Sequence, residues 1–241
     1  MHRGYTPHGN NLLSVLRDED IALIDPWLSE WTLPRGHVLC EAGDPVRFCY
    51  LPRHAAVAAF VIPTESGSAV ESAIVGREGA LGGIVSHGRI PAFARATVLQ
   101  GGSFYRIAAT DLEKAKQASP TIHGLFVRYA DCLLAQVFQS VACNASHTIV
   151  QRAARWLEAA IERSGGDEVM LTQEQFAGLL GVGRSYASRV LQQLKAEGIV
   201  AIRRGTLRVA DRDALAARAC GCNQAVRDHF DEVLRGVYPQ G

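Results

Sequence analysis

The sequence lacks a long apolar run and a secretion signal. No stretch of about 18 apolar residues is present, which excludes a membrane-spanning helix of ordinary length. The opening residues, MHRGYTPHGNN, contain no apolar core of the kind that a secretory signal requires. The six cysteines are scattered along the chain, a distribution that favours free thiols in a reducing compartment. We therefore expect a cytoplasmic protein.

The sequence also lacks a strong excess of either charge. The formal net charge is +1 over 241 residues, which excludes a polybasic, histone-like protein. It does not exclude a DNA-binding protein, because the local density of positive charge decides that function. Apolar residues make up 48% of the chain, enough for one large or two modest cores.

The chain contains three successive segments that differ in the spacing of their apolar residues. Residues 12–30 have helical spacing up to Pro26, and residues 31–107 are short apolar runs separated by Gly, Pro, Asp and Ser. Such runs without intervening long helices favour an antiparallel β-roll or β-sandwich over a parallel α/β sheet. Pro120 then starts a periodic segment that predicts a helix of about seven turns over residues 120–145.

The long helix has a seam that is typical of a coiled coil. A small β-domain cannot cover the whole length of such a helix, so we expect it to pair with a second copy of the chain. The alternative is a long packing helix within a monomer. The predicted seam residues are Ile122, Phe126, Tyr129 and Leu133.

The stretch GLLGVGRS, residues 178–185, allows two functions. Its first and last glycines, five residues apart and followed by Arg184 and Ser185, are close to the phosphate-binding G-x-x-x-x-G-K-[ST] loop, but the lysine is absent. A phosphate loop must also follow a buried strand, whereas Thr172 and Gln175 form the capping-box signature of a helix. The stretch therefore favours the turn of a helix-turn-helix, with Gly181 in the turn.

The second helix of this motif presents polar residues that suit DNA. Ala187, Val190, Leu191 and Leu194 form its inward face, and the segment GIVAIRRGTLRVADR after it predicts a two-stranded wing. Seven basic and two acidic residues lie between Arg184 and Arg212, a local charge of +5 that fits a phosphate-binding face. A winged helix used for protein interaction is the alternative. The predicted DNA-binding residues are Arg184, Ser185, Tyr186, Ser188, Arg189, Arg203 and Arg204.

The chain resembles the Crp/Fnr superfamily of bacterial transcription regulators. The resemblance rests on residues 171–215, LTQEQFAGLL…DRDAL, on LPRGHVLCEAGDP at residues 33–45, and on the long helix before the DNA-binding region. It implies an α+β fold: a sensor domain of the cyclic-nucleotide-binding β-roll type at residues 1–119, a dimerisation helix at 120–146 and a winged helix with a C-terminal helix at 147–241. It also implies a non-enzymatic homodimer that binds a pseudo-palindromic site on double-stranded DNA, with RNA polymerase and a small-molecule effector as further candidate partners.

Two departures from the family pattern concern specificity. Ser185 stands where many members have a glutamate after the first arginine of the recognition helix, so we expect a different operator base there. Members that bind cyclic AMP have a Gly-Glu pair and an arginine in the pocket, whereas this chain has Gly82 and Gly83. Arg95 is one place late before Thr97, which on a strand turns its side chain to the opposite face. These four residues are weak candidates for an effector pocket, and we expect cyclic AMP not to be the effector.

No cofactor or metal is expected. Residues 1–39 contain no cysteine, which excludes the N-terminal iron–sulfur ligands of the oxygen sensors in this superfamily. His37, His54 and His87 are possible haem ligands, but lone histidines are usually surface residues. Cys220 and Cys222 would point apart on a helical tail, and Cys132 and Cys143 are expected to pack as small apolar residues. The alternatives to a regulator with a small-molecule effector are a redox- or metal-responsive regulator that uses its cysteines, and a constitutive DNA binder.

Overall fold

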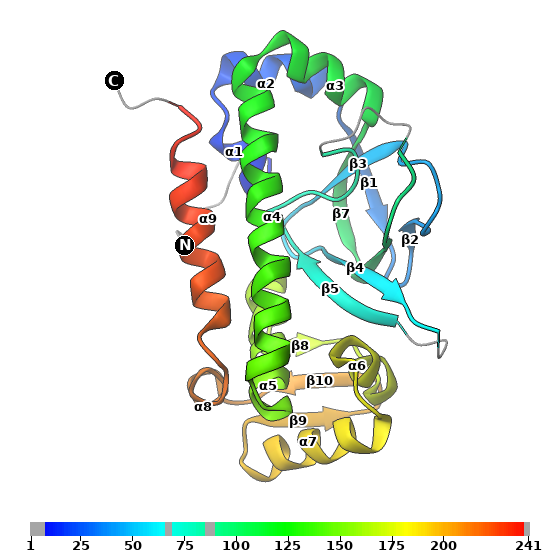
Figure 1. The fold of residues 1–241 in the computed structure, drawn as a ribbon, viewed down its shortest axis with the longest axis vertical. Helices are drawn as coiled ribbons and strands as arrows, with labels where there is room; N and C mark the ends of the chain where they lie inside the picture. Colours follow the sequence, from blue (N-terminus) through cyan, green and yellow to red (C-terminus); the bar gives the residue numbers. More distant parts are fainter. Residues whose placement is uncertain (1–7, 66–68, 85–89, 239–241) are drawn as a thin grey trace.

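The computed structural model describes residues 8–65, 69–84 and 90–238 of the chain (Figure 1). Its first part is an antiparallel β-roll that follows α1 (Asn11–Val15), α2 (Asp18–Ile24) and the short 3-10 helix η1 (Asp25–Trp27). The strands of the roll are β1 (Ser29–Leu33), β2 (Val38–Cys40), β3 (Phe48–Pro52), β4 (Val57–Pro63), β5 (Ala69–Val75), β6 (Arg95–Gln100) and β7 (Gly102–Ala108).

The roll consists of two antiparallel sheets with a shared core. One sheet has the order β1-β7-β3 and the other has the order β2-β6-β4-β5. Burial alternates along β6, where Ala96 and Val98 turn inward, as the period of two in an extended chain requires. This confirms the predicted β-roll. The core residues are Leu33, Tyr50, Ala56, Ala58, Val75, Leu81, Ala96, Val98 and Phe104.

A short helix, α3 (Ala109–Ala118), connects the roll to α4 (Pro120–Ser146), which is the predicted long helix. Pro120 occupies the first turn of α4, where its missing N–H costs no hydrogen bond, and the Ser119 side chain accepts from the backbone N–H of Ile122. α4 passes alongside the β-roll and reaches the C-terminal region (Figure 1). Tyr129 on α4 donates to the carbonyl of Ala80 at 2.9 Å, which joins the helix to the roll.

The region after α4 is a winged helix. A capping box at Thr148 starts the first helix of this region. Its sheet has the order β8-β10-β9, and β8 is a strand that the sequence analysis did not predict. None of the helices in the described ranges has the length and apolar character needed to cross a lipid bilayer. The elements are α5 (Ile149–Ser164), β8 (Glu168–Val169), α6 (Gln173–Leu180), α7 (Arg184–Ala196), β9 (Val200–Arg203), β10 (Thr206–Val209) and α8 (Arg212–Arg218).

The chain ends in α9 (Cys222–Arg235), which lies along α4 (Figure 1). The ring of Phe230 on α9 packs edge-to-face on Tyr129 of α4, with ring centroids 6.3 Å apart. α9 therefore covers one face of α4, and the β-roll covers another.

Candidate nucleic-acid interface

The helix-turn-helix forms for local reasons that the sequence contains. Thr172 accepts from the N–H of Gln175, whose side chain accepts from the N–H of Thr172, and this capping box starts α6. Gly181 ends α6 in the left-handed region, with φ of 66°. Gly183 caps α7, which begins at Arg184. Because a helix and not a strand precedes the turn, the phosphate-loop interpretation is wrong.

The side chains of α7 divide as predicted into a buried and an exposed face. Ala187, Val190, Leu191 and Leu194 are at most 2% exposed. The outward face begins at Arg184, the first residue of the helix. On this face the Arg189 guanidinium lies 5.3 Å from the centre of the Tyr186 ring. This cation–π contact restricts the orientation of Arg189. Arg184, Ser185, Tyr186 and Arg189 are exposed, and Ser188 is half-buried.

The wing adds two more arginines beside α7. β9 and β10 pair in register from Val200–Val209 to Arg203–Thr206, and Gly205 turns the hairpin with φ of 73°. An open groove lies between the start of α7 and the wing, and Arg184, Arg203 and Arg204 line it together with Glu174.

Most positive charges of this face have no acidic partner. Within the described ranges, no salt bridge engages Arg184, Arg189, Arg203, Arg204 or Arg208. By contrast, Arg212 pairs with Asp167 at 2.6 Å, so it contributes less to the face than its sequence position suggested. The unpaired guanidinium groups are available to phosphates and base edges.

The winged helix is docked on the β-roll. Trp156 on α5 donates to Glu71 on β5 at 2.7 Å, and Arg163 donates to Glu78 at 2.6 Å. Burial raises the pKa of Glu71 to about 7, against the lowering effect of the hydrogen bond from Trp156. α6 lies close to β5, where a Cβ atom at Gly178 would lie 3.2 Å from the carbonyl oxygen of Ala69.

The β-roll contains a cavity that only one of the four candidate effector residues lines. The cavity has a volume of about 320 Å³, and Gly82 is at its edge. Ala96 on β6 turns into it, so Arg95 and Thr97 face the other way, as the shifted position of Arg95 predicted. Arg95 pairs with Glu41 at 2.6 Å and Thr97 donates to the carbonyl of His37 at 3.4 Å.

Gly83 lies outside this lining too. Gly83, Arg95 and Thr97 therefore do not line this cavity, and their role in an effector pocket stays a prediction. The residues that do line it are Leu39, Cys40, Asp44, Pro45, Val46, Arg47, Phe48, Tyr50, Leu81, Gly82 and Ala96. His87, one of the possible haem ligands, lies outside the described residues.

The predicted dimer seam is on the wrong face of α4. Ile122, Phe126 and Tyr129 are at most 1% exposed and pack in the core of one chain, and Leu133 is half-buried against the same core. These side chains cannot reach a partner, because the β-roll, the N-terminal helices and α9 already cover them. The apolar residues that α4 leaves exposed are Val127, Leu134, Phe138 and Val141, each between 48% and 64% exposed.

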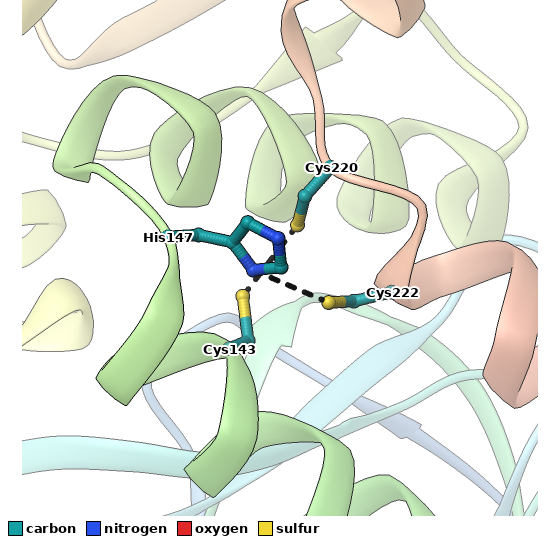
Figure 2. A group of neighbouring side chains, drawn as sticks. All are labelled: Cys143, His147, Cys220 and Cys222. Carbon is teal, nitrogen blue, oxygen red and sulfur yellow. Dashed lines mark hydrogen bonds between the residues drawn. The ribbon is translucent and has the colours of Figure 1, made fainter.

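Four residues that the sequence did not bring together meet at the C-terminal end of α4 (Figure 2). Cys143 is in the last turn of α4, and His147 caps that helix. Cys220 lies between α8 and α9, and Cys222 is the first residue of α9. Their ligand atoms all lie within 4.8 Å of one another. The prediction that Cys220 and Cys222 point apart is wrong, because α8 ends before Cys220 and the tail is not one continuous helix there.

Comparisons with known proteins agree with the helix-turn-helix described above. Residues 151–218 match the family model of the Crp-like helix-turn-helix domain. No curated protein matches the chain in sequence.

Solved structures share the fold over most of this chain. A putative Crp/Fnr-family regulator from Eubacterium rectale is 16% identical, with a TM-score of 0.65 over 86% of this chain and 96% of that one. FixK2 from Bradyrhizobium japonicum is 17% identical, with a TM-score of 0.66 over 80% and 98%. The c-di-GMP-responsive regulator CLP from Xanthomonas campestris is 16% identical, with a TM-score of 0.65 over 81% and 100%.

Proposed function

We propose that this chain, a DNA-binding transcription regulator by its Crp-like helix-turn-helix domain and its Crp/Fnr fold, acts as a homodimer on a pseudo-palindromic operator. The observation that carries the proposal is the exposed, unpaired arginine set at the start of α7 and on the wing. In this arrangement α7 enters the major groove, where Arg184 and Arg189 contact guanine edges or phosphates. Arg203 and Arg204 on the wing contact the backbone of the same half-site.

The exposed apolar face of α4 supports the homodimer. Val127, Leu134, Phe138 and Val141 follow one another at intervals of seven, four and three residues, which places them on one side of the helix. Four large apolar side chains in such a row mark an interaction surface. A second copy of the same helix is the partner that fits it, because a two-fold seam is self-complementary. Contact with RNA polymerase stays a prediction from the family resemblance.

Cyclic AMP is not the effector in this proposal. The cavity in the β-roll has no carboxylate at Gly82 or Gly83, and Arg95 faces away from it. A thermal-shift measurement tests this point, since a ligand that binds only the native state raises the melting temperature. We expect no shift with cyclic AMP, and a saturable increase would contradict the proposal.

The experiment that tests the function is selection of bound sequences from a random DNA pool with the full chain. We expect enrichment of a two-fold symmetric site with half-sites about one helical turn apart. Arg184→Ala and Arg189→Ala should lose the enrichment. Arg235→Ala is the matched control, because Arg235 is an exposed arginine on the last turn of α9, where it pairs with Glu232. Enrichment of the same site by Arg184→Ala and Arg189→Ala would refute the placement of the recognition helix.

A further inference from the structure

We propose that Cys143, His147, Cys220 and Cys222 bind one divalent transition-metal ion with the preferences of Zn²⁺, in a closed tetrahedral site. The site is separate from the DNA-binding face and the β-roll cavity, and the proposal does not depend on DNA binding.

The spacing of the ligand atoms fits a single ion. Zn–S bonds of about 2.3 Å and Zn–N bonds of about 2.0 Å at tetrahedral angles place two sulfurs about 3.8 Å apart and a sulfur and a nitrogen about 3.5 Å apart. In the structure the Sγ atoms of Cys143 and Cys220 are 3.5 Å apart. The Sγ of Cys222 and the Nδ1 of His147 are 3.6 Å apart. Both pairs therefore have the separation of ligands that share one metal.

The donor set selects the class of metal. Three thiolates and one imidazole are soft and borderline ligands that suit Zn²⁺ and not Mg²⁺ or Ca²⁺. Four protein ligands leave no open position for water, as in structural zinc sites. An iron–sulfur cluster fits less well, because its bridging sulfides separate cysteines that ligate different irons.

The surroundings of the cluster favour an anionic metal complex. Gln139, one turn before Cys143 on α4, donates its amide to the Sγ of Cys222 at 3.1 Å. Three thiolates around a divalent ion carry a net charge of −1. Two arginines of α5, Arg152 and Arg155, interact electrostatically with Cys143, and the Nε atoms of both are buried without a hydrogen-bond partner among the described residues.

The fold holds the ligands in place from two sides. Cys143 and His147 are four residues apart, so they lie one turn from each other at the end of α4. Asn223, next to Cys222, donates to the carbonyl of Arg155 at 2.9 Å and so fastens the start of α9 to α5. The ion would join the end of α4, the linker to α5 and the turn between α8 and α9. We infer a structural clamp at the junction between the long helix and the winged helix.

The test is titration of the full chain, reduced and stripped with a chelator, with Co²⁺ and then Zn²⁺. We expect one equivalent of Co²⁺ to give the intense visible bands of tetrahedral thiolate coordination, and one equivalent of Zn²⁺ to remove them. Cys143→Ser and Cys222→Ser should each lower the intensity of the thiolate bands and weaken Co²⁺ binding, and His147→Gln should also weaken Co²⁺ binding. The matched controls are Cys40→Ser on β2 and His123→Gln on α4, which lie outside the cluster and should bind as the unmodified chain does.

A second variant keeps the test valid if a ligand substitution unfolds the protein. Gln139→Ala retains all four ligands, and loss of its hydrogen bond to Cys222 should weaken Co²⁺ binding by about tenfold with an unchanged circular-dichroism spectrum. Three results would overturn the proposal. These are a weak octahedral Co²⁺ spectrum, equal loss of binding in the control variants, and a Cys143–Cys220 disulfide or an iron–sulfur spectrum in the protein as purified.

Discussion

Replacement of Phe138 by alanine should separate the proposed homodimer without unfolding the chain. Phe138 is 63% exposed in the single chain, in the middle of the apolar face of α4. A phenylalanine offers about 200 Å² of surface. A seam that covers the exposed part of Phe138 therefore buries about 125 Å², worth about 3 kcal/mol per protomer at about 25 cal/mol per Å².

The loss in affinity follows from two-fold symmetry. Alanine retains about a third of the buried area, so each protomer loses about 2 kcal/mol and the dimer about 4 kcal/mol. That corresponds to a dissociation constant about a thousandfold higher. Sedimentation equilibrium over a range of protein concentrations measures this change directly.

The matched control is Phe93→Ala. Phe93 is 88% exposed and lies just before β6, outside α4, so the same substitution there should leave the dimer intact. Phe126→Ala should instead destabilise the fold of the single chain. Phe126 is 0% exposed in the core of one chain, so its loss should lower the free energy of unfolding by about 3–5 kcal/mol. A Phe138→Ala protein that dimerises as tightly as the unmodified chain would refute the assignment of this face.

Three further predictions concern the DNA-binding face and the contact between the domains. Arg184→Ala and Arg189→Ala should each weaken binding to the selected operator by about 1–3 kcal/mol in fluorescence anisotropy, with an unchanged melting temperature because both side chains are exposed. Arg204→Ala should weaken binding to all sequences and reduce the slope of log K against log salt by about one. An unchanged slope would show that Arg204 on the wing does not contact the DNA. Burial raises the pKa of Glu71 from 4.5 to about 7, so the stability that Glu71 contributes is complete below pH 4.5 and is lost as the pH rises through about 7. Glu71→Gln should flatten the dependence of the melting temperature on pH in that window, and an equally steep dependence in the variant would assign it to another group.

The helix-turn-helix was predictable because its determinants are local. Thr172 with Gln175, Gly181 and the inward apolar residues of α7 are all within a few turns of one another in sequence. Such signals need no knowledge of the rest of the fold. The placement of Arg95 on the far face of β6 from Ala96 was predictable for the same reason, from the period of two along a strand.

The seam and the cysteine cluster depend on distant contacts. α4 is apolar on more than one face, and only the positions of the β-roll and α9 decide that Phe126 is inside and Phe138 outside. Cys143 and Cys220 are 77 residues apart in sequence, and only the return of α9 along α4 brings them together. The spacing of Cys143 and His147 by one helical turn was a signal that could have indicated ligands on a common face.

The docking of the winged helix on the β-roll determines how the chain unfolds. Val57 and Ile74, from strands of the roll, belong to the same apolar cluster as Trp156, Leu157 and the other core residues of the winged helix. A fragment that begins at α5 would expose the side of this cluster that the roll covers. Cooperativity follows from a shared core, because neither part can lose its structure while the other keeps its own contacts. The two parts should therefore melt in one calorimetric transition, and a change that loosens the β4–β5 hairpin should also lower the stability of α7.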